Sequence, residues 1–168
     1  MRRAVAAVVA SVAVSLVATS AVAETVTKPQ AVGDEFVPGH DLTKVRYTNR
    51  TGAITATAWV GRLHRSDIIE LKIATGDVPD YNYIAVGKFT AGEARGEVRT
   101  FNFGTSEETV TCQTRVRFDF RRDRVKIRMP DACFSGSDLT RILLNTGLGV
   151  RGHNNLGDYT ANYVVRRD

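Results

Sequence analysis

The sequence predicts an all-β protein, an antiparallel β-sandwich of immunoglobulin-like or jelly-roll-like type with eight or nine strands and one disulfide. Short runs of residues alternate between apolar and polar side chains, which is the period expected of half-buried strands. Glycine, aspartate, asparagine and proline separate these runs, and helical periodicity is weak. Strands at this spacing, in a chain of 168 residues of which 43% are hydrophobic, are typical of a single sandwich or barrel domain.

Nine segments carry the alternating pattern. The clearest is residues 54–60, where four apolar residues alternate with Thr55, Thr57 and Trp59. The segment 139–145 fits either a strand or a turn of helix. The predicted strands comprise residues 42–48, 54–60, 68–73, 83–89, 97–103, 109–120, 124–129, 139–145 and 159–165.

Residues 1–23 have the pattern of a secretory signal peptide. Arg2 and Arg3 precede an uncharged run of mostly alanine and valine, which ends at Ala23 in the small-x-small pattern that signal peptidase accepts. A membrane anchor is the alternative interpretation, because about 20 apolar residues can cross a bilayer. We expect cleavage after Ala23 and a secreted, extracellular protein that has no membrane span after signal cleavage.

The remaining chain divides into an arm and a domain. Residues 24–40 are polar, contain two of the four prolines and lack periodicity, so they are expected to form a flexible N-terminal arm. Residues 41–168 form the predicted β-sandwich domain. The domain shows no internal repeat and no linker that would divide it further.

Composition excludes several classes of function. Removing residues 1–23 takes away two basic residues and no acidic ones, so the net charge falls from +5 to +3. A nucleic-acid binder usually carries a larger positive excess, and we therefore expect no nucleic-acid partner. With two cysteines and three histidines, the chain offers little material for a metal or redox centre, and we expect neither cofactor nor metal.

The segment from Cys112 to Cys133 gives the most specific structural prediction. Three apolar residues that end at Phe120 share one face before the sequence R-R-D-R, and three more that begin at Val125 share one face after it. A hairpin that pairs Phe120 with Val125 would place Cys112 opposite Cys133. Two cysteines in an exported protein most simply form a disulfide. Closing a loop of about 20 residues would contribute roughly 3 kcal/mol.

The other face of this predicted hairpin is basic, and two acids, Asp119 and Asp123, accompany the cations. The candidate anion-binding residues are Arg115, Arg117, Arg121, Arg122, Arg124, Lys126 and Arg128. In the predicted register Asp119 faces Lys126, while Arg117 faces Arg128. One interpretation is a solvated strand face whose charges discourage edge-to-edge aggregation. The other is a surface for a teichoic-acid-like polymer, an acidic polysaccharide or an acidic protein, because facing cations gain most when an anion bridges them.

Catalytic patterns are weak in this chain. His64, Ser66 and Asp67 are close in sequence, but strand alternation directs His64 and Ser66 to one side and Asp67 to the other, so the carboxylate is badly placed to orient the imidazole. A G-x-S-x-G motif is missing, and no pair of carboxylates stands out for glycoside hydrolysis. The sequence therefore assigns no catalytic residue and favours a non-enzymatic role.

Two polar loops are further candidate ligand sites. The first contains Asp77, Asp80, Tyr81, Asn82 and Tyr83. Its oxygen atoms could hold Ca²⁺ and a tyrosine ring could stack on a sugar, but it lacks the D-x-D-x-D-G frame, so an ordinary turn is the alternative. The second precedes the last predicted strand and contains His153, Asn154, Asn155 and Asp158. Both interpretations depend on the general tendency of loops to carry function.

Several short motifs resemble a known group of proteins. They are the opening D-L-T-K-V-R-Y-T-N of residues 41–49, the P-D-Y of residues 79–81, and the I-R-M-P-D-A-C-F of residues 127–134 that ends the arginine-rich hairpin. With the alanine- and valine-rich leader, this layout resembles small secreted single-disulfide β-sandwich proteins of filamentous actinobacteria that have no assigned activity. The resemblance implies the fold and export, and it transfers no catalytic residue.

These observations together predict a secreted binding or interaction module for an anionic or glycan component of the cell envelope. One alternative is a hydrolase of envelope glycans or esters, which would need a deep pocket with His64 or His153 near an acid. Another is a protein-recognition or inhibitor domain, which would present a rigid exposed loop. A glycan module would instead expose Tyr81 or Tyr83 beside Asp77 and Asp80.

Overall fold

The computed structural model describes residues 24–27, 41–76, 81–102, 104–105, 107–150, 156–160 and 162–167. The predicted signal peptide, residues 1–23, and residues 28–40 of the predicted arm lie outside the described residues. The strands are β1 (Glu24–Thr27), β2 (Leu42–Arg50), β3 (Ala53–Val60), β4 (Asp67–Thr75), β5 (Tyr83–Thr90), β6 (Glu93–Asn102), β7 (Glu107–Asp119), β8 (Arg124–Pro130), β9 (Arg141–Val150), β10 (Leu156–Tyr159) and β11 (Tyr163–Arg166). A short 3₁₀ helix, η1 (Asp131–Phe134), follows β8.

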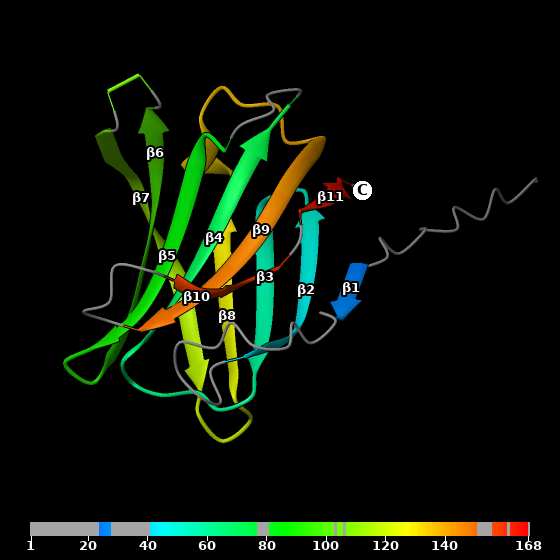
Figure 1. Cartoon of the computed structure of the whole chain (residues 1–168). Helices are drawn as coiled ribbons and strands as arrows, with labels where there is room; N and C mark the ends of the chain where they lie inside the picture. The colour runs from blue at the N-terminus through cyan, green and yellow to red at the C-terminus, as the bar shows by residue number, and fades with distance from the viewer. Residues whose placement is uncertain are drawn as a thin grey trace, which may run out of the picture.

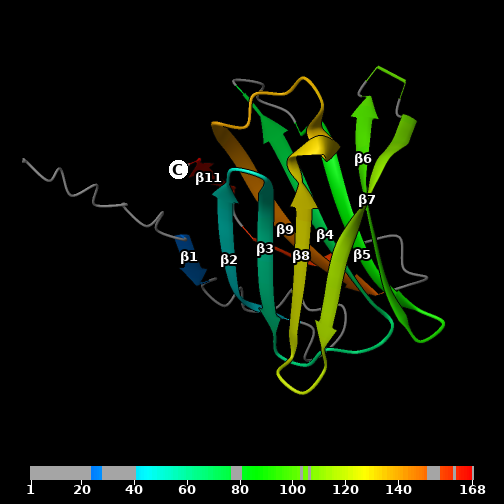
Figure 2. The ribbon, with the colours of Figure 1, turned by 180° about the vertical axis from the view of Figure 1, so that it is seen from behind.

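The described strands form one antiparallel sheet of nearly barrel shape. Their order is β1-β2-β3-β8-β7-β6-β5-β4-β9-β10, and β11 pairs with β9 beside this path. Strands β5, β4 and β9 face the viewer in Figure 1, with β3 and β8 behind them; Figure 2 shows β2, β3, β8 and β7 from the opposite side. The all-β prediction is confirmed.

Strand β7 joins the two layers of the sheet. Its residues from Glu107 to Thr114 pair with β6, and its residues from Arg115 to Asp119 pair with β8. Eight of the nine segments predicted from the sequence each overlap one strand, and the ambiguous segment 139–145 belongs mainly to β9. The segment 159–165, predicted as one strand, instead overlaps the end of β10 and most of β11. Strand β1, which pairs with β2, was not predicted because residues 24–27 carry no alternating pattern long enough to recognise.

Alternation along the strands builds the core between the two layers. Leucine, isoleucine, valine and alanine side chains fill it, and the largest fully buried residue is Tyr47. The hydroxyl oxygen of Tyr47 lies 2.6 Å from Thr146 Oγ1 and 3.3 Å from Thr160 Oγ1, and burial raises the pKa of this phenol. These contacts link β2 to β9 where the two ends of the sheet approach each other. The buried hydroxyl of Tyr47 therefore has hydrogen-bond partners, and these contacts join the two ends of the sheet.

The predicted register of the β7–β8 hairpin is wrong by two residues. Asp119 pairs with Arg124, Phe118 with Val125 and Val116 with Ile127. The turn thus consists of residues 120–123, with Asp123 in the left-handed region at φ 46°. A shift of two residues leaves every side chain on its predicted face, because strand side chains alternate with a period of two.

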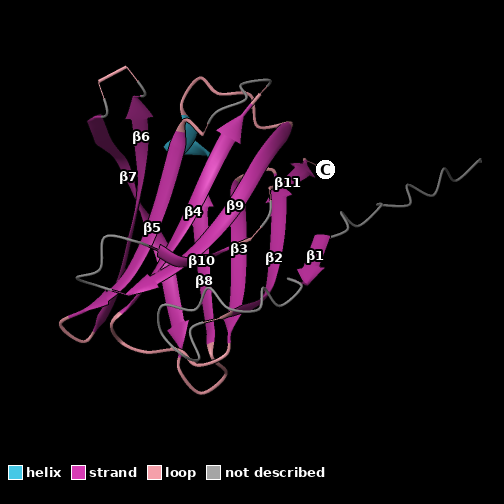
Figure 3. Cartoon of the chain, in the orientation of Figure 1, coloured by secondary structure: helices cyan, strands magenta, loops and turns pink. Residues whose placement is uncertain are grey.

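The predicted disulfide between Cys112 and Cys133 is confirmed, with the two Cα atoms 5.3 Å apart. Its geometry differs from the prediction, because Cys133 lies on η1 and not opposite Cys112 on a continuing strand. Figure 3 shows η1 as a short helix at one end of the molecule. The neighbouring Phe134 is buried and packs edge-on against Tyr83 with ring centres 5.0 Å apart, so the bond fixes an apolar cover over this end of the core.

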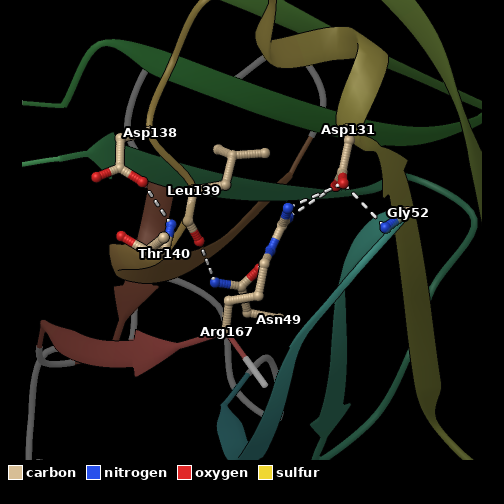
Figure 4. Close-up of polar contacts among 7 residues, drawn as sticks. All are labelled: Asn49, Gly52, Asp131, Asp138, Leu139, Thr140 and Arg167. Atoms are coloured by element: carbon tan, nitrogen blue, oxygen red, sulfur yellow. Dashed lines mark hydrogen bonds and ion pairs between the residues drawn. The ribbon is translucent and has the colours of Figure 1, made fainter.

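Arg167 fastens the C-terminal segment to the β2–β3 hairpin and η1 (Figure 4). Its guanidinium donates two hydrogen bonds to the Asp131 carboxylate, at 2.8 and 3.0 Å, and a third to Asn49 Oδ1 at 3.1 Å. The buried Asn49 amide in turn donates to the carbonyl of Leu139 at 2.7 Å, and Gly52 N–H donates to Asp131 at 2.9 Å. The residues of this cluster come from four separate parts of the chain.

Replacing Arg167 with methionine is expected to lower the free energy of unfolding by about 1–3 kcal/mol, because Asp131 and Asn49 would lose hydrogen bonds to a charged donor. Urea unfolding monitored by circular dichroism measures the change. Arg166→Met is the matched control, since Arg166 is exposed and next in sequence. Equal stability of the two variants would contradict a stabilising role for the Arg167 contacts.

Candidate anion-binding surface

Strands β2, β3, β8 and the second half of β7 expose a common outer face. Along β2, buried Val45, Tyr47 and Asn49 alternate with residues that point away from the core. The same alternation on β8 buries Val125 and Ile127. We call the outward residues of these strands the basic face: Lys44, Arg46, Thr48, Arg50, Ala53, Thr55, Thr57, Trp59, Arg115, Arg117, Asp119, Arg124, Lys126 and Arg128.

The strand register arranges the basic face in rows. In one row Thr57 of β3 lies between Arg46 of β2 and Lys126 of β8, and Arg117 of β7 follows beyond Lys126. In the next row Thr55 lies between Thr48 and Arg128, and Arg115 follows. Each row therefore has a threonine on β3 and cationic side chains on β8 and β7, and the row of Thr57 has a cation, Arg46, on β2 as well. Figure 2 shows these four strands side by side.

An open depression of about 510 Å³ follows from this arrangement. Its lining residues are Arg46, Thr48, Arg50, Thr51, Ala53, Thr55, Thr57, Lys126 and Arg128. We call this depression the β3 groove, because β3 contributes its floor. A groove lined by hydroxyl groups and cations, without an acid among its described lining residues, has the chemistry expected of an anion site.

Most cations on the β7–β8 half of the basic face are not neutralised by neighbours. Arg115, Arg117, Lys126 and Arg128 form no ion pair or side-chain hydrogen bond with another described residue. Arg115 nevertheless lies opposite Arg128, and Arg117 lies opposite Lys126. Like charges in directly opposed strand positions repel each other. A bound anion between them would replace this repulsion with attraction.

Two features limit the basic face at the end near the β7–β8 turn. Arg124 donates to Asp119 at 2.9 Å, so this cation is paired within the protein. Lys44 and Arg46 lie over the ring of Trp59, with Lys44 Nζ 5.2 Å and Arg46 Cζ 5.7 Å from the ring centre. Cations over an aromatic face are held in place by the electron density of the ring. The tryptophan therefore positions two cations at one end of the β3 groove.

The opposite layer presents a balanced surface of both charge signs. Arg99 lies between two acids there, donating to Glu108 at 2.6 Å and to Glu97, and its hydrogen bond to Glu108 raises the pKa of Arg99. Glu70 lies 3.8 Å from Lys72, and burial raises the pKa of the Glu70 carboxyl. Charge on the described surface is thus segregated, with ion pairs over β4–β7 and uncompensated cations over β8 and the second half of β7.

The structure gathers five of the seven cations predicted from the hairpin sequence onto the basic face. The other two, Arg121 and Arg122, are exposed in the turn between β7 and β8. The predicted facing pairs change with the register: Asp119 faces Arg124 and not Lys126, and Arg117 faces Lys126 and not Arg128.

Asp123, the second acid of the predicted hairpin, does not reduce the charge of the basic face. Its carboxylate accepts a hydrogen bond from Leu63 N–H at 2.9 Å, and its carbonyl accepts one from Val60 N–H. The aspartate is therefore used to hold the loop between β3 and β4 against the turn. Its side chain stabilises this end of the fold.

The cations of β2 were missed in the sequence. Lys44, Arg46 and Arg50 occupy the outward positions of the first strand of the domain, and β3 brings them within two strands of β8. Their even residue numbers, which place them on one face of the strand L-T-K-V-R-Y-T-N-R, were the available signal. The sequence could not show that β2 and β8 both pair with β3, because the β3–β8 pairing joins residues that are 65 to 77 positions apart in the sequence.

The candidate glycan or calcium loop is partly described. Tyr83 is buried and its hydroxyl lies 2.7 Å from Ser137 Oγ, so it has no exposed ring for a sugar. Asn82 donates its amide to Thr75 Oγ1, and Tyr81 donates to Asn162 Oδ1. Asp77 and Asp80 lie outside the described residues. Within the described part of this loop, the polar side chains are therefore engaged with the protein itself.

The remaining polar candidates do not form a catalytic arrangement among the described residues. Asp67 is buried and accepts a hydrogen bond from the backbone N–H of His64 at 2.7 Å, which fixes the turn before β4. His153, Asn154 and Asn155 lie outside the described residues. No cluster of three or more potential metal ligands among histidine, cysteine, aspartate and glutamate occurs in the described part of the chain.

Comparison with models of known protein families gives no match, and comparison with curated proteins gives none either. The chemistry of the surface itself is therefore the basis for assigning a function. Among the described residues, the structure contains no helix of the length and apolar character needed to cross a bilayer.

Proposed function

We propose that this chain is a secreted binding module whose basic face holds an anionic polymer of the cell envelope. The leader-like residues 1–23 support export, and a disulfide is a common covalent cross-link in exported domains. The proposal treats the two layers as the expected β-sandwich, with one outer surface for binding and the other for solubility. It assigns no catalytic step to the protein.

The observation that carries this proposal is the set of facing cations on β7 and β8. Arg115, Arg117, Lys126 and Arg128 lie opposite one another in pairs and have no acidic partner among the described residues. Such an arrangement costs electrostatic free energy in the unbound protein. Charge-assisted hydrogen bonds to phosphate or carboxylate recover that free energy, and arginine does so with two parallel bonds.

Replacing Lys126 and Arg128 with serine is expected to weaken binding of poly(glycerol phosphate) at least tenfold at low salt. The slope of log affinity against log salt concentration should also become shallower by about 1.4, since each contact to a single-stranded polyanion releases about 0.7 counterion. Isothermal titration calorimetry over a series of salt concentrations measures both quantities.

The control variant removes the same charge from the opposite layer. Lys88 and Arg95 face each other across β5 and β6, and Arg95 lies 3.7 Å from Glu93. Lys88→Ser with Arg95→Ser therefore matches the test variant in the charge that it removes. This control is expected to bind with nearly the wild-type affinity. Equal losses in both variants would show that net charge alone governs binding, and no loss in the Lys126/Arg128 variant would overturn the proposal.

A further inference from the structure

The β3 groove has a direction, which the proposed function does not by itself require. Its floor consists of Ala53, Thr55 and Thr57, which follow one another along β3. Its walls are Arg46 and Arg50 on β2, and Lys126 and Arg128 on β8. Because neighbouring strands lie about 4.8 Å apart, the backbones of the two walls are separated by roughly 9.6 Å. This width admits one extended chain lying parallel to β3.

Cations recur at every step along the groove. At the level of Thr57 the walls present Arg46 and Lys126, and at the level of Thr55 they present Arg128. Arg50 follows at the level of Ala53. At the other end, Lys44 stands at the level of Trp59. Successive levels are two residues apart, which corresponds to about 6.8 Å along an antiparallel strand.

This spacing corresponds to a particular polymer backbone. Two residues of an extended polypeptide contain six backbone bonds and span about 6.6–7.2 Å. A phosphodiester chain with three carbon atoms between consecutive phosphates also has six bonds per repeat, counted as P–O, O–C, C–C, C–C, C–O and O–P. When such a chain is extended beside β3, its negative charges and the cations of the walls have matching periods.

We infer that the β3 groove binds a linear phosphodiester polymer with a three-carbon repeat, which lies lengthwise along β3 with one phosphate at each level. This inference rests on the proposed function and adds the ligand class and its direction. The hydroxyls of Thr55 and Thr57 supply hydrogen bonds to phosphate oxygens from the floor. Inorganic polyphosphate has two bonds per repeat, so its charges are too closely spaced to meet successive levels singly.

The residues that line the groove distinguish between two classes of polymer with a six-bond backbone repeat. Single-stranded nucleic acids share the six-bond repeat, but proteins bind them on aromatic side chains that stack with the bases. Among the described residues, the groove lining contains no aromatic side chain, and Trp59 at its end already contacts Lys44 and Arg46. The surface chemistry therefore favours a polymer without bases, such as poly(glycerol phosphate).

Thr57→Phe tests whether the polymer lies lengthwise along β3, and it leaves the charge of the protein unchanged. Phenylalanine suits an outward strand position, and its ring would fill the floor between Arg46 and Lys126. We expect at least a fivefold loss of affinity for poly(glycerol phosphate). Thr109→Phe is the matched control, because Thr109 is an exposed threonine in the part of β7 that pairs with β6. Circular dichroism and urea unfolding confirm that both variants are folded.

The polymer comparison uses the mature protein at one salt concentration. Poly(glycerol phosphate), oligodeoxythymidylate and inorganic polyphosphate with equal numbers of phosphates serve as probes, and the first should bind at least fivefold tighter than the other two. Equal affinities, or an unchanged affinity of Thr57→Phe, would overturn the lengthwise groove while the Lys126/Arg128 result still decides the proposed function. Tighter binding of oligodeoxythymidylate would overturn the choice of a polymer without bases.

Discussion

Replacing Cys112 and Cys133 together with alanine is expected to lower the free energy of unfolding by about 3 kcal/mol. The bond joins residues 21 apart in sequence, and cross-linking a loop of this size removes roughly that much conformational freedom from the unfolded chain. Alanine suits both positions because Cys133 is buried and Cys112 is partly buried against the core, where a serine hydroxyl would need a hydrogen-bond partner. A loss of this size is a large part of the total stability of about 5–15 kcal/mol typical of such domains.

Urea unfolding of the double variant and of the wild type, each with and without reductant, measures the effect. Reduced wild type should approach the stability of the alanine variant, and reductant should leave the variant unchanged. Because η1 carries Cys133 beside Phe134, the variant should also show altered near-ultraviolet circular dichroism from Tyr83. Oxidised wild type and variant within about 0.5 kcal/mol of each other would refute the prediction.

The sequence predicted which face each strand residue occupies, but it did not predict the hairpin register. Val116 and Phe118 lie on the apolar face, as expected, yet they pair with Ile127 and Val125 two positions away from the predicted partners. A one-residue slip would have moved apolar side chains to the solvent, whereas a two-residue slip leaves the pattern intact. What fixes the register is local: Asp123 adopts the left-handed region, and Asp119 pairs with Arg124.

The residues that close the fold were beyond prediction for a different reason. Tyr47 meets Thr146 and Thr160 across about 100 residues of sequence, and Arg167 reaches Asn49 across 118. Alternation identifies an inward tyrosine or a C-terminal arginine, but it carries no information about which distant strand lies opposite. Pairings of this kind depend on the global arrangement of the sheet.

The candidate site was predicted in part. The cations that were predicted lie on strands adjacent in sequence, whereas those that were missed depend on pairing between distant strands. The cations of β7 and β8 were visible because a hairpin joins neighbouring segments of the chain. The opposite wall of the groove comes from β2, and its position depends on the long-range pairing of β3 with β8. The groove itself, with short threonine side chains between Arg46 and Lys126, exists only when three strands are placed side by side.

Replacing Gly96 with alanine is expected to destabilise the protein by about 1–3 kcal/mol or more, the range found for overpacked cores. Gly96 of β6 faces Gly87 of β5, and Val116 packs over both glycines where β7 leaves β6 to join β8. A Cβ atom at Gly96 would lie 2.1 Å from Val116 Cγ2, and one at Gly87 would lie 2.8 Å from Ile69 Cγ2. The two buried glycines thus make room for the strand that passes between the layers.

A double-mutant cycle tests whether Val116 is the cause. Val116→Ala removes the clashing methyl groups, so the Gly96→Ala/Val116→Ala protein should be more stable than the sum of the single effects predicts, by about 1–3 kcal/mol. Gly104→Ala is the matched control. Of the described residues beyond its chain neighbours, its added Cβ meets within 4 Å only the end of the Asn102 side chain, so the variant should be unchanged or slightly stabilised. Strictly additive effects in the cycle would show that the strain at Gly96 arises elsewhere, since relief at Val116 would then contribute nothing.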